Sequence, residues 1–261
     1  MRVGVFDSGV GGLSVLKSVL EARLFADIIY YGDTARVPYG PKDKATIEHF
    51  ALEALEFFKP YKIEMLLVAC NTVSSLALEV MRAHSSIPIV GVIESGILAI
   101  TQQFKDKHTP ILVLGTRATI ASGQYAQQLH AHGYINVHSL ATGLFVPLIE
   151  EGVLEGDLLQ ACMQHYFQAI EHAPAAIILG CTHFPFIAPS LQRYFQERFK
   201  CSCILVHSGD AIVHHLQESH RLTPLTAPPQ VRFFASGDVN ALCIQAEAWL
   251  GSALYPSCQN A

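Results

Sequence analysis

The chain has 261 residues, of which 51% are apolar and only 15% are charged. This composition excludes an intrinsically disordered protein, and the length suits two compact units with full hydrophobic cores. A formal net charge of −5, without a cluster of lysine and arginine, argues against a nucleic-acid partner. The apolar runs are shorter than the roughly 18 residues that span a bilayer, and the N-terminal MRVGVFDSG has no signal-peptide core. We therefore expect a cytoplasmic protein with no membrane partner.

The first part of the chain alternates short apolar runs with amphipathic stretches. The stretch at 46–58, for example, places Ile47, Ala51, Ala54 and Phe58 on one face at the spacing of an α-helix. By the same criteria, we expect strands at residues 2–6, 27–31, 64–69 and 87–92, and helices at residues 14–24, 46–58, 73–84 and 96–105.

The same alternation continues to the end of the chain, interrupted by a Pro- and Thr-rich loop at 222–230. Strands that alternate with helices in this way predict parallel sheets with helices on both faces. Further strands are expected at residues 111–114, 135–139, 176–179, 202–206 and 231–235, and further helices at residues 120–132, 158–172, 187–199, 210–220 and 240–250.

Three strand segments of the first half recur, in the same order, in the second half. VGVFDSG (3–9) resembles LVLGTRA (112–118), LLVACNT (66–72) resembles IILGCTH (177–183), and IPIVGVIES (87–95) resembles SCILVHSGD (202–210). The repeat predicts an α/β fold of two pseudo-symmetric, doubly wound parallel-sheet domains, with the active site in the cleft between them. We expect residues 1–95 plus 208–261 to form one domain and residues 96–207 to form the other.

Two of the seven cysteines, Cys70 and Cys181, occupy matched positions at the ends of strands in this repeat. Ligands bind at the carboxyl ends of the strands in open parallel sheets, so the two thiols are expected to face each other across one cleft. A cysteine that ends a strand is often only a packing residue, but packing alone does not explain two cysteines at matched places. In a reducing compartment, all seven are expected to be thiols, and the other five to be structural or surface residues.

A matched pair of thiols suits a reaction that inverts a carbon centre. Such a reaction removes a proton from one face of the substrate and delivers a proton to the other face, and the two roles are exchanged in the reverse direction. A free thiol has a pKa of about 8.5, close enough to neutral for its surroundings to adjust it. We therefore expect Cys70 and Cys181 to be paired acid–base groups that act on one small substrate.

The side chains beside the cysteines fit a small anionic substrate. Asn71 and Thr72 follow the first cysteine, and Thr182 and His183 follow the second. These side chains and the backbone N–H groups at the start of a helix can hold a carboxylate. Asp7, at the end of the first strand, and His183 are candidates to orient the thiols or to relay protons.

A glycine-rich segment, GVGG (9–12), follows the first strand, as in a dinucleotide-binding fold. The pattern G-x-G-x-x-G fails, because Ser14 occupies the place of the third glycine. We interpret the segment as a tight turn that places Asp7 and Ser8 over the cleft.

Metal and cofactor chemistry find little support in the sequence. Cys181, His183, Cys201 and Cys203 do not have the spacing of a usual zinc site, so we expect no metal. A Cys–His hydrolase built on Cys181 and His183 leaves Cys70 unexplained. Since no lysine stands in an obvious Schiff-base context either, we expect no cofactor.

Six segments spread over most of the chain form a specific signature: VFDSGVGGLSV (5–15), YYGDTARVPYG (30–40), LLVACNT (66–72), PIVGVIE (88–94), FVPLIEEG (145–152) and ILGCTHFP (178–185). Together they closely resemble the glutamate racemase family. The resemblance implies a cofactor-independent isomerase that interconverts L- and D-glutamate, supplies D-glutamate for bacterial peptidoglycan and forms a homodimer.

The resemblance also implies roles for individual residues. Cys70 and Cys181 match the catalytic pair, with Asp7 assisting Cys70, and Glu150 and His183 assisting Cys181. The matching segments imply substrate contacts from Asp7, Ser8, Tyr39, Gly40, Asn71, Thr72, Thr116, Thr119, Thr182 and His183.

Two alternatives stay open from the sequence. One is a racemase or isomerase of the same superfamily that acts on aspartate or a related acid, because nothing in the spacing reports the length of the substrate. The other is a two-lobed binding protein without chemistry, which would bind glutamate and leave its α-hydrogen unexchanged with solvent.

Overall fold

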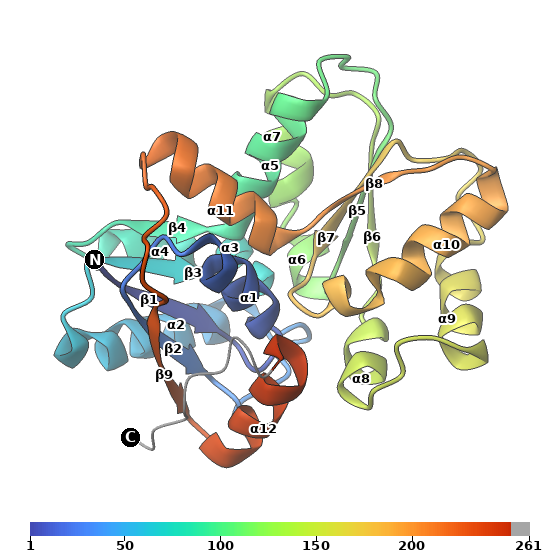
Figure 1. Ribbon diagram of the computed structural model, residues 1–261. Coiled ribbons are helices and arrows are strands. Elements are labelled where there is room, and N and C mark those ends of the chain that lie inside the picture. The colour runs from blue at the N-terminus through green and yellow to red at the C-terminus, as the bar shows by residue number, and fades with distance from the viewer. Residues whose placement is uncertain (252–261) are drawn as a thin grey trace.

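The strands form two sheets in which every strand pair is parallel (Figure 1). The structure is a computed structural model, and it describes residues 1–251. The first sheet has the order β4-β3-β1-β2-β9, formed by β1 (Arg2–Asp7), β2 (Asp27–Gly32), β3 (Met65–Val68), β4 (Ile89–Gly91) and β9 (Gln230–Ala235). The second sheet has the order β6-β5-β7-β8, formed by β5 (Ile111–Gly115), β6 (Val137–Ala141), β7 (Ala176–Gly180) and β8 (Ile204–Val206).

The order of strands is the same in both sheets. Read from one edge, β4-β3-β1-β2 of the first sheet corresponds to β8-β7-β5-β6 of the second, and β9 is an additional edge strand. The three sequence segments that recur along the chain therefore occupy equivalent strands. This confirms the predicted fold class of two pseudo-symmetric, doubly wound parallel sheets.

Each sheet and the helices packed on it form a lobe (Figure 1). The first lobe contains α1 (Leu13–Ala22), α2 (Lys44–Phe58), the 3-10 turn η1 (Lys59–Tyr61), α3 (Asn71–Leu76), α4 (Leu78–Ala83) and α12 (Val239–Leu250). The second lobe contains α6 (Arg117–Ala121), α7 (Gln124–Ala131), α8 (Phe145–Glu150), α9 (Asp157–Phe167), the 3-10 turn η2 (Phe184–Ile187) and α10 (Ala188–Phe199). Two further helices, α5 (Val92–Gln103) and α11 (Ser208–Ser219), link the lobes.

The helix expected at 158–172 ends at Phe167, the helix expected from residue 96 begins at Val92, and three larger differences concern the number of helices. The helix expected at 73–84 divides at Ala77, whose backbone angles (φ −124°, ψ −5°) interrupt the helix between α3 and α4. The helix expected at 120–132 divides at Gly123, which has a φ of +69° that glycine adopts without a steric penalty. The short helix α8 was not expected from periodicity.

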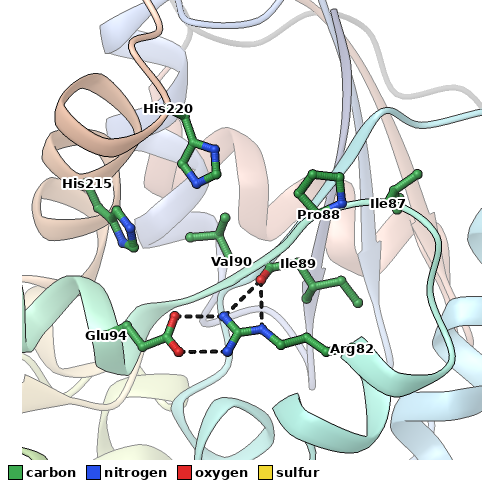
Figure 2. A pocket seen from close by; sticks show the side chains of 8 residues that line it. All are labelled: Arg82, Ile87, Pro88, Ile89, Val90, Glu94, His215 and His220. Carbon is green, nitrogen blue, oxygen red and sulfur yellow. Dashed lines mark hydrogen bonds and ion pairs between the residues drawn. The ribbon is translucent and has the colours of Figure 1, made fainter.

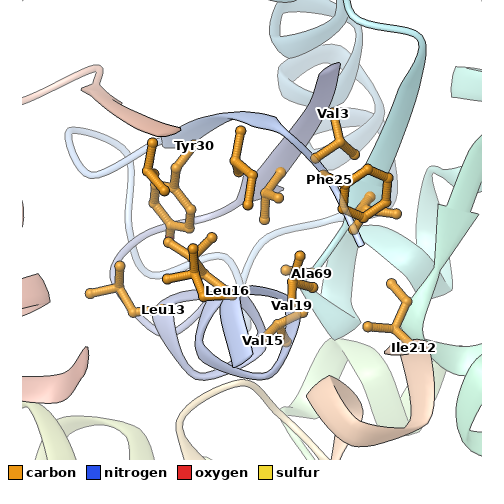
Figure 3. Packing of buried hydrophobic residues seen from close by; sticks show 14 of the residues in the cluster. Val3, Leu13, Val15, Leu16, Val19, Phe25, Tyr30, Ala69 and Ile212 are labelled. Carbon is orange, nitrogen blue, oxygen red and sulfur yellow. The ribbon is translucent and has the colours of Figure 1, made fainter. Parts of the chain in front are cut away.

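Hydrophobic clusters cover both faces of each sheet. On one face of the first sheet, Val15, Leu16 and Val19 of α1 pack with Val3 and Tyr30, and all five are fully buried (Figure 3). Burial of such a side chain contributes about 1.5–3 kcal/mol. This packing fixes α1 on the sheet, and with it the turn that joins β1 to α1.

The linking helices cross from one lobe to the other. The helix α5 follows β4 of the first sheet and contacts β7 and β8 of the second, while α11 follows β8 and packs on α1 and α5. The domain boundary expected after residue 95 falls within the first turn of α5, and the boundary before residue 208 coincides with the start of α11. The two boundaries remain a prediction, and residues 252–261 of the expected first domain lie outside the described residues.

Five cysteines are free thiols, as expected: Cys70, Cys162, Cys181, Cys201 and Cys203. Cys243 is disulfide-bonded, which corrects the expectation of thiols throughout. Of the helices within residues 1–251, none has the length and apolar character required to cross a membrane.

Candidate active site

A pocket of about 550 Å³ lies where the carboxyl ends of the two sheets meet. It is lined from both lobes, and both Cys70 and Cys181 contribute to its wall. The predicted site residues that line it are Ser8, Tyr39, Gly40, Cys70, Asn71, Thr72, Thr116, Glu150, Cys181, Thr182 and His183. The structure therefore brings together most of the side chains that the sequence singled out.

Cys70 is a buried thiol at the start of α3, with 5% of its surface exposed. Its Sγ–H donates to the hydroxyl oxygen of Ser8 at 3.3 Å. Burial raises the pKa of Cys70 to about 12, and the negative charge of Asp7 acts in the same direction, against the hydrogen bonds with Ser8 and with the Val73 backbone. In this arrangement, Cys70 keeps its proton at neutral pH and can act as an acid.

Cys181 has a different set of partners. Its Sγ lies 3.8 Å from Nδ1 of His183, and Nε2 of His183 lies 3.0 Å from a carboxylate oxygen of Glu150. Burial by itself lowers the pKa of His183, but its hydrogen bonds with Cys181 and Glu150 outweigh burial and raise the pKa to about 10. His183 is therefore protonated at neutral pH, and its positive charge lies beside the Cys181 sulfur.

Asp7 lies beneath the pocket and is fully buried. Its carboxylate accepts hydrogen bonds from the backbone N–H of Gly9 at 2.9 Å and from the hydroxyl of Thr182 at 3.5 Å. Burial raises the pKa of Asp7, partly opposed by the positive charge of His183 and the backbone N–H groups of Gly9 and Gly12. Asp7 interacts electrostatically with Cys70 and with His183, the partner of Cys181, so it lies between the two thiol arrangements.

The glycine turn before α1 permits close contact between the lobes. A Cβ atom at Gly11 would lie 2.4 Å from the hydroxyl oxygen of Thr182, and one at Gly12 would lie 2.4 Å from Cβ of Asp7. The hydroxyl of Ser14 donates to the carbonyl oxygen of Thr182 at 2.6 Å. These contacts agree with the interpretation of the segment as a tight turn at the cleft.

Three threonine hydroxyls form a cluster across the two lobes. The Oγ1 atoms of Thr72 and Thr116 are 3.0 Å apart, and Thr119 lies 3.3 Å from Thr72 and 3.0 Å from Thr116. Gly40 packs on Thr116, where a Cβ would come within 3.0 Å of the threonine Cβ. Of the three hydroxyls, that of Thr119 supports the other two from behind the pocket wall, whereas Thr72 and Thr116 line it.

Tyr39 is 2% exposed, and its hydroxyl donates to the buried carboxylate of Asp33. The same carboxylate accepts a hydrogen bond from Ser236 at 2.5 Å and pairs with Arg36 at 2.7 Å. Burial, and then the hydrogen bond to Asp33, raise the pKa of Tyr39. In this conformation, the Tyr39 hydroxyl is occupied by Asp33, although Tyr39 still lines the pocket as predicted.

Some residues of the pocket were not predicted from the sequence. Arg117 supplies a positive charge to the wall, and a cation two residues after the end of β5 was a signal available in the sequence. The wall also has an apolar part that sequence patterns did not reveal, with Val37, Pro38, Leu144, Val146, Pro147 and Tyr166.

A second pocket, of about 420 Å³, contains none of the predicted site residues (Figure 2). Arg82 forms two hydrogen bonds of 2.7 Å with Glu94 and also donates to the carbonyl oxygen of Ile89. His215 and His220 line the opposite side. The guanidinium of Arg82 is thus fully used by partners of the same chain, and these hydrogen bonds hold α4 against β4 and α5. Within residues 1–251, no group of three or more His, Cys, Asp or Glu residues is arranged to hold a metal ion.

Comparison with known proteins agrees with this geometry. Residues 8–216 match the model of the Asp/Glu/Hydantoin racemase family. Over 253 residues, the chain is 62% identical to a glutamate racemase of Helicobacter acinonychis, covering 96% of this chain and 99% of that relative. These matches confirm the resemblance drawn from the six sequence segments.

Solved structures give the same result. The glutamate racemase of Campylobacter jejuni superposes with a TM-score of 0.92 at 52% identity, covering 97% of this chain and 99% of that one. The glutamate racemase of Francisella tularensis, solved in complex with D-glutamate, superposes with a TM-score of 0.83 at 31% identity, covering 99% of this chain and 95% of that one. The chain therefore belongs to the Asp/Glu/hydantoin racemase family and, within it, to the glutamate racemases.

Proposed function

We propose that this protein interconverts L- and D-glutamate without a cofactor, with Cys70 and Cys181 acting on opposite faces of the α-carbon. The observation that carries the proposal is that two buried thiols, at equivalent strand ends of the two sheets, line one pocket. Each thiol has its own proton-handling partners. The names of the relatives and the D-glutamate bound by the Francisella tularensis enzyme support glutamate as the substrate.

The proposed reaction is a pair of proton transfers. The thiolate of one cysteine removes the α-proton of bound glutamate, which leaves an electron pair on the α-carbon. The thiol of the other cysteine then donates its proton to the opposite face, and the configuration is inverted. After one turnover, the two cysteines have exchanged their protonation states, and Asp7 and His183 return the site to its starting state by moving protons to and from solvent.

The carbanion needs stabilisation, because the α-proton of an amino acid is only weakly acidic. The hydroxyls of Ser8, Thr72 and Thr182 and the amide of Asn71 converge on the pocket, and hydrogen-bond donors fixed in advance lower the free energy of developing charge. In this proposal they hold the α-carboxylate. Arg117 is placed to attract the second carboxylate of glutamate at the wall of the pocket.

The biological role follows from the family. We propose that the protein acts in the cytoplasm and supplies D-glutamate for peptidoglycan, and that two copies form a homodimer. Sedimentation of the purified protein tests the dimer, since a monomer at micromolar concentration contradicts it.

The activity is tested with dialysed protein and L-glutamate as the only addition. Loss of optical rotation to zero is expected, and L-aspartate in a parallel reaction is expected to keep its rotation. Racemisation of aspartate in preference to glutamate supports the alternative substrate. Binding of glutamate without any change of rotation supports a binding protein and contradicts the proposal.

A further inference from the structure

A chain of buried hydrogen bonds lies behind the pocket. Tyr125, on α7 of the second lobe, donates its hydroxyl hydrogen to Oδ1 of Asn71 at 2.7 Å. Nδ2 of Asn71 lies 3.3 Å from the hydroxyl oxygen of Ser208, and this hydroxyl donates to the carbonyl oxygen of Leu179 at 3.3 Å. All four residues are buried.

The chain of hydrogen bonds connects the two cysteine segments. Asn71 is the residue after Cys70, and Leu179 lies in β7 shortly before Cys181. Its members come from both lobes and from the linking helix α11, which begins at Ser208. Of these members, Asn71 lines the pocket, whereas Tyr125 and Ser208 stand behind it.

The hydrogen bonds fix which way the Asn71 amide faces. The hydroxyl hydrogen of Ser208 is used by Leu179, so Ser208 accepts its second hydrogen bond from the nitrogen of Asn71. At the other end, the oxygen of Asn71 accepts from Tyr125. An amide nitrogen carries two hydrogens, and Ser208 takes one of them, so the second is not used by these hydrogen bonds, and Asn71 lines the pocket.

We propose that Tyr125 and Ser208 are positioning residues that hold the Asn71 amide with its remaining N–H directed at a substrate carboxylate. The inference rests on the proposed function and assigns roles to two residues outside the predicted set of site residues. Without either partner, the amide is free to turn. A turned amide presents its oxygen to the carboxylate, which replaces a hydrogen bond by repulsion.

The first test is Tyr125→Phe, which removes the hydroxyl and keeps the ring. Loss of a hydrogen bond to a charged group predicts a rise of about tenfold or more in KM for both L- and D-glutamate. A lower fraction of folded enzyme reduces the apparent kcat but leaves KM unchanged, so KM separates positioning from general damage.

A second variant, Ser208→Ala, releases the amide from the other end and is expected to raise KM in the same way. When one end is released, the other no longer fixes the orientation. The double variant is therefore expected to have a KM close to that of the more affected single variant, which is a non-additive result.

Tyr134→Phe is the matched control. Tyr134 is also fully buried in the second lobe, and its hydroxyl donates to the carbonyl oxygens of Ile100 and Phe104, away from the pocket. This variant removes a buried tyrosine hydroxyl as well, so its melting temperature is expected to fall, while its KM stays that of the wild type.

The wild type is measured first, because a wild type that does not racemise glutamate contradicts the proposed function, and the inference falls with it. An active wild type, with both Tyr125→Phe and Ser208→Ala folded and within about twofold of its KM, contradicts the inference alone. If Tyr125→Phe does not fold, Ser208→Ala decides the question by the same criterion.

Discussion

The two thiols of the pocket have unequal surroundings. Burial raises the pKa of Cys70 to about 12, against the effect of its hydrogen bond with Ser8. Cys181 instead lies beside the His183 imidazole, whose second nitrogen contacts a carboxylate oxygen of Glu150. A two-base reaction requires one acid and one base at a time. The unequal surroundings are therefore consistent with a resting site in which Cys70 carries the proton.

Replacement of either thiol is expected to remove racemisation. Cys70→Ser and Cys181→Ser each exchange a tunable group for a hydroxyl that does not ionise near neutral pH, and general acid–base catalysis contributes about 10²- to 10⁴-fold. We expect kcat to fall by at least this factor in each variant. Cys162→Ser, outside the pocket, is the control. A Cys70 or Cys181 variant that keeps most of its kcat contradicts the two-thiol scheme.

Glu150→Gln tests the electrostatic support of His183. The substitution keeps the shape of the side chain and removes its negative charge, so the pKa of His183 is expected to fall from about 10. The alkaline limb of the kcat/KM profile is then expected to move to lower pH by about one unit. Glu151→Gln, which changes the adjacent residue outside the pocket, is expected to leave the profile in place. An unchanged limb in Glu150→Gln contradicts the role assigned to this pair.

The same pair links stability to pH. The pKa of His183 is raised in the folded protein from an ordinary value of about 6.5. The stability that the protonated His183 contributes is therefore fully present below about pH 6.5, and it is lost as the pH rises through about 10.

At the scale of elements, the site depends on the ends of strands and on the turns that follow them. Gly12→Ala places a methyl group 2.4 Å from Cβ of Asp7. Such overpacking costs about 1–3 kcal/mol, and each kcal/mol lowers the melting temperature of a protein of this size by roughly 2–4 °C. We expect a lower melting temperature together with a loss of activity, because Asp7 is displaced.

Gly96→Ala is the control for this prediction. A Cβ at Gly96, within α5, would meet its nearest side-chain atom, in Tyr125, at an ordinary distance of 3.4 Å. Alanine in a helix is favoured over glycine by about 1 kcal/mol, so the melting temperature is expected to stay or rise. A Gly12→Ala protein as stable as Gly96→Ala contradicts the packing argument.

Periodicity predicted most elements, because amphipathic helices and buried strands leave a direct pattern in the sequence. It did not predict α8, a helix of six residues that is too short for a clear period and contains Pro147. Since α8 carries Glu150, this residue was identified only through the family resemblance. The breaks at Ala77 and Gly123 were missed for a related reason, since the apolar pattern continues across them.

At the scale of the whole molecule, α12 anchors the end of the described chain to the second lobe. The ring of Trp249 lies against that of Phe186 in a tilted arrangement, with a centroid distance of 3.9 Å, and meets His183 edge-on at 6.1 Å. The two partners belong to the second lobe, whereas α12 packs on β9 and α1 of the first. This contact therefore joins the lobes next to the site.

Trp249→Ala removes this contact. Loss of the aromatic pairs and of the buried ring surface is expected to cost about 2 kcal/mol. Ile244→Ala, on the same helix with 70% of its surface exposed, is expected to leave the melting temperature nearly unchanged. Equal melting temperatures for the two variants contradict the assignment of Trp249 to the interface between the lobes.

The arrangement of the lobes was predictable only in part. The sequence repeat predicted two matched sheets and the meeting of Cys70 and Cys181 at one pocket. It did not predict β9 beside β2, because parallel pairing between distant segments leaves no local signal. Nor did it predict the contact of Tyr125 with Asn71, which forms only when α7 and α3 come together across the lobes.

The most direct test of the two-thiol account follows deuterium at early times in D₂O, starting from L-glutamate. Two separate acid–base groups predict that the first D-glutamate formed carries deuterium at the α-carbon, while the remaining L-glutamate still carries protium. Deuterium that enters the remaining L-glutamate as fast as the product indicates one base serving both faces, and that result contradicts the account.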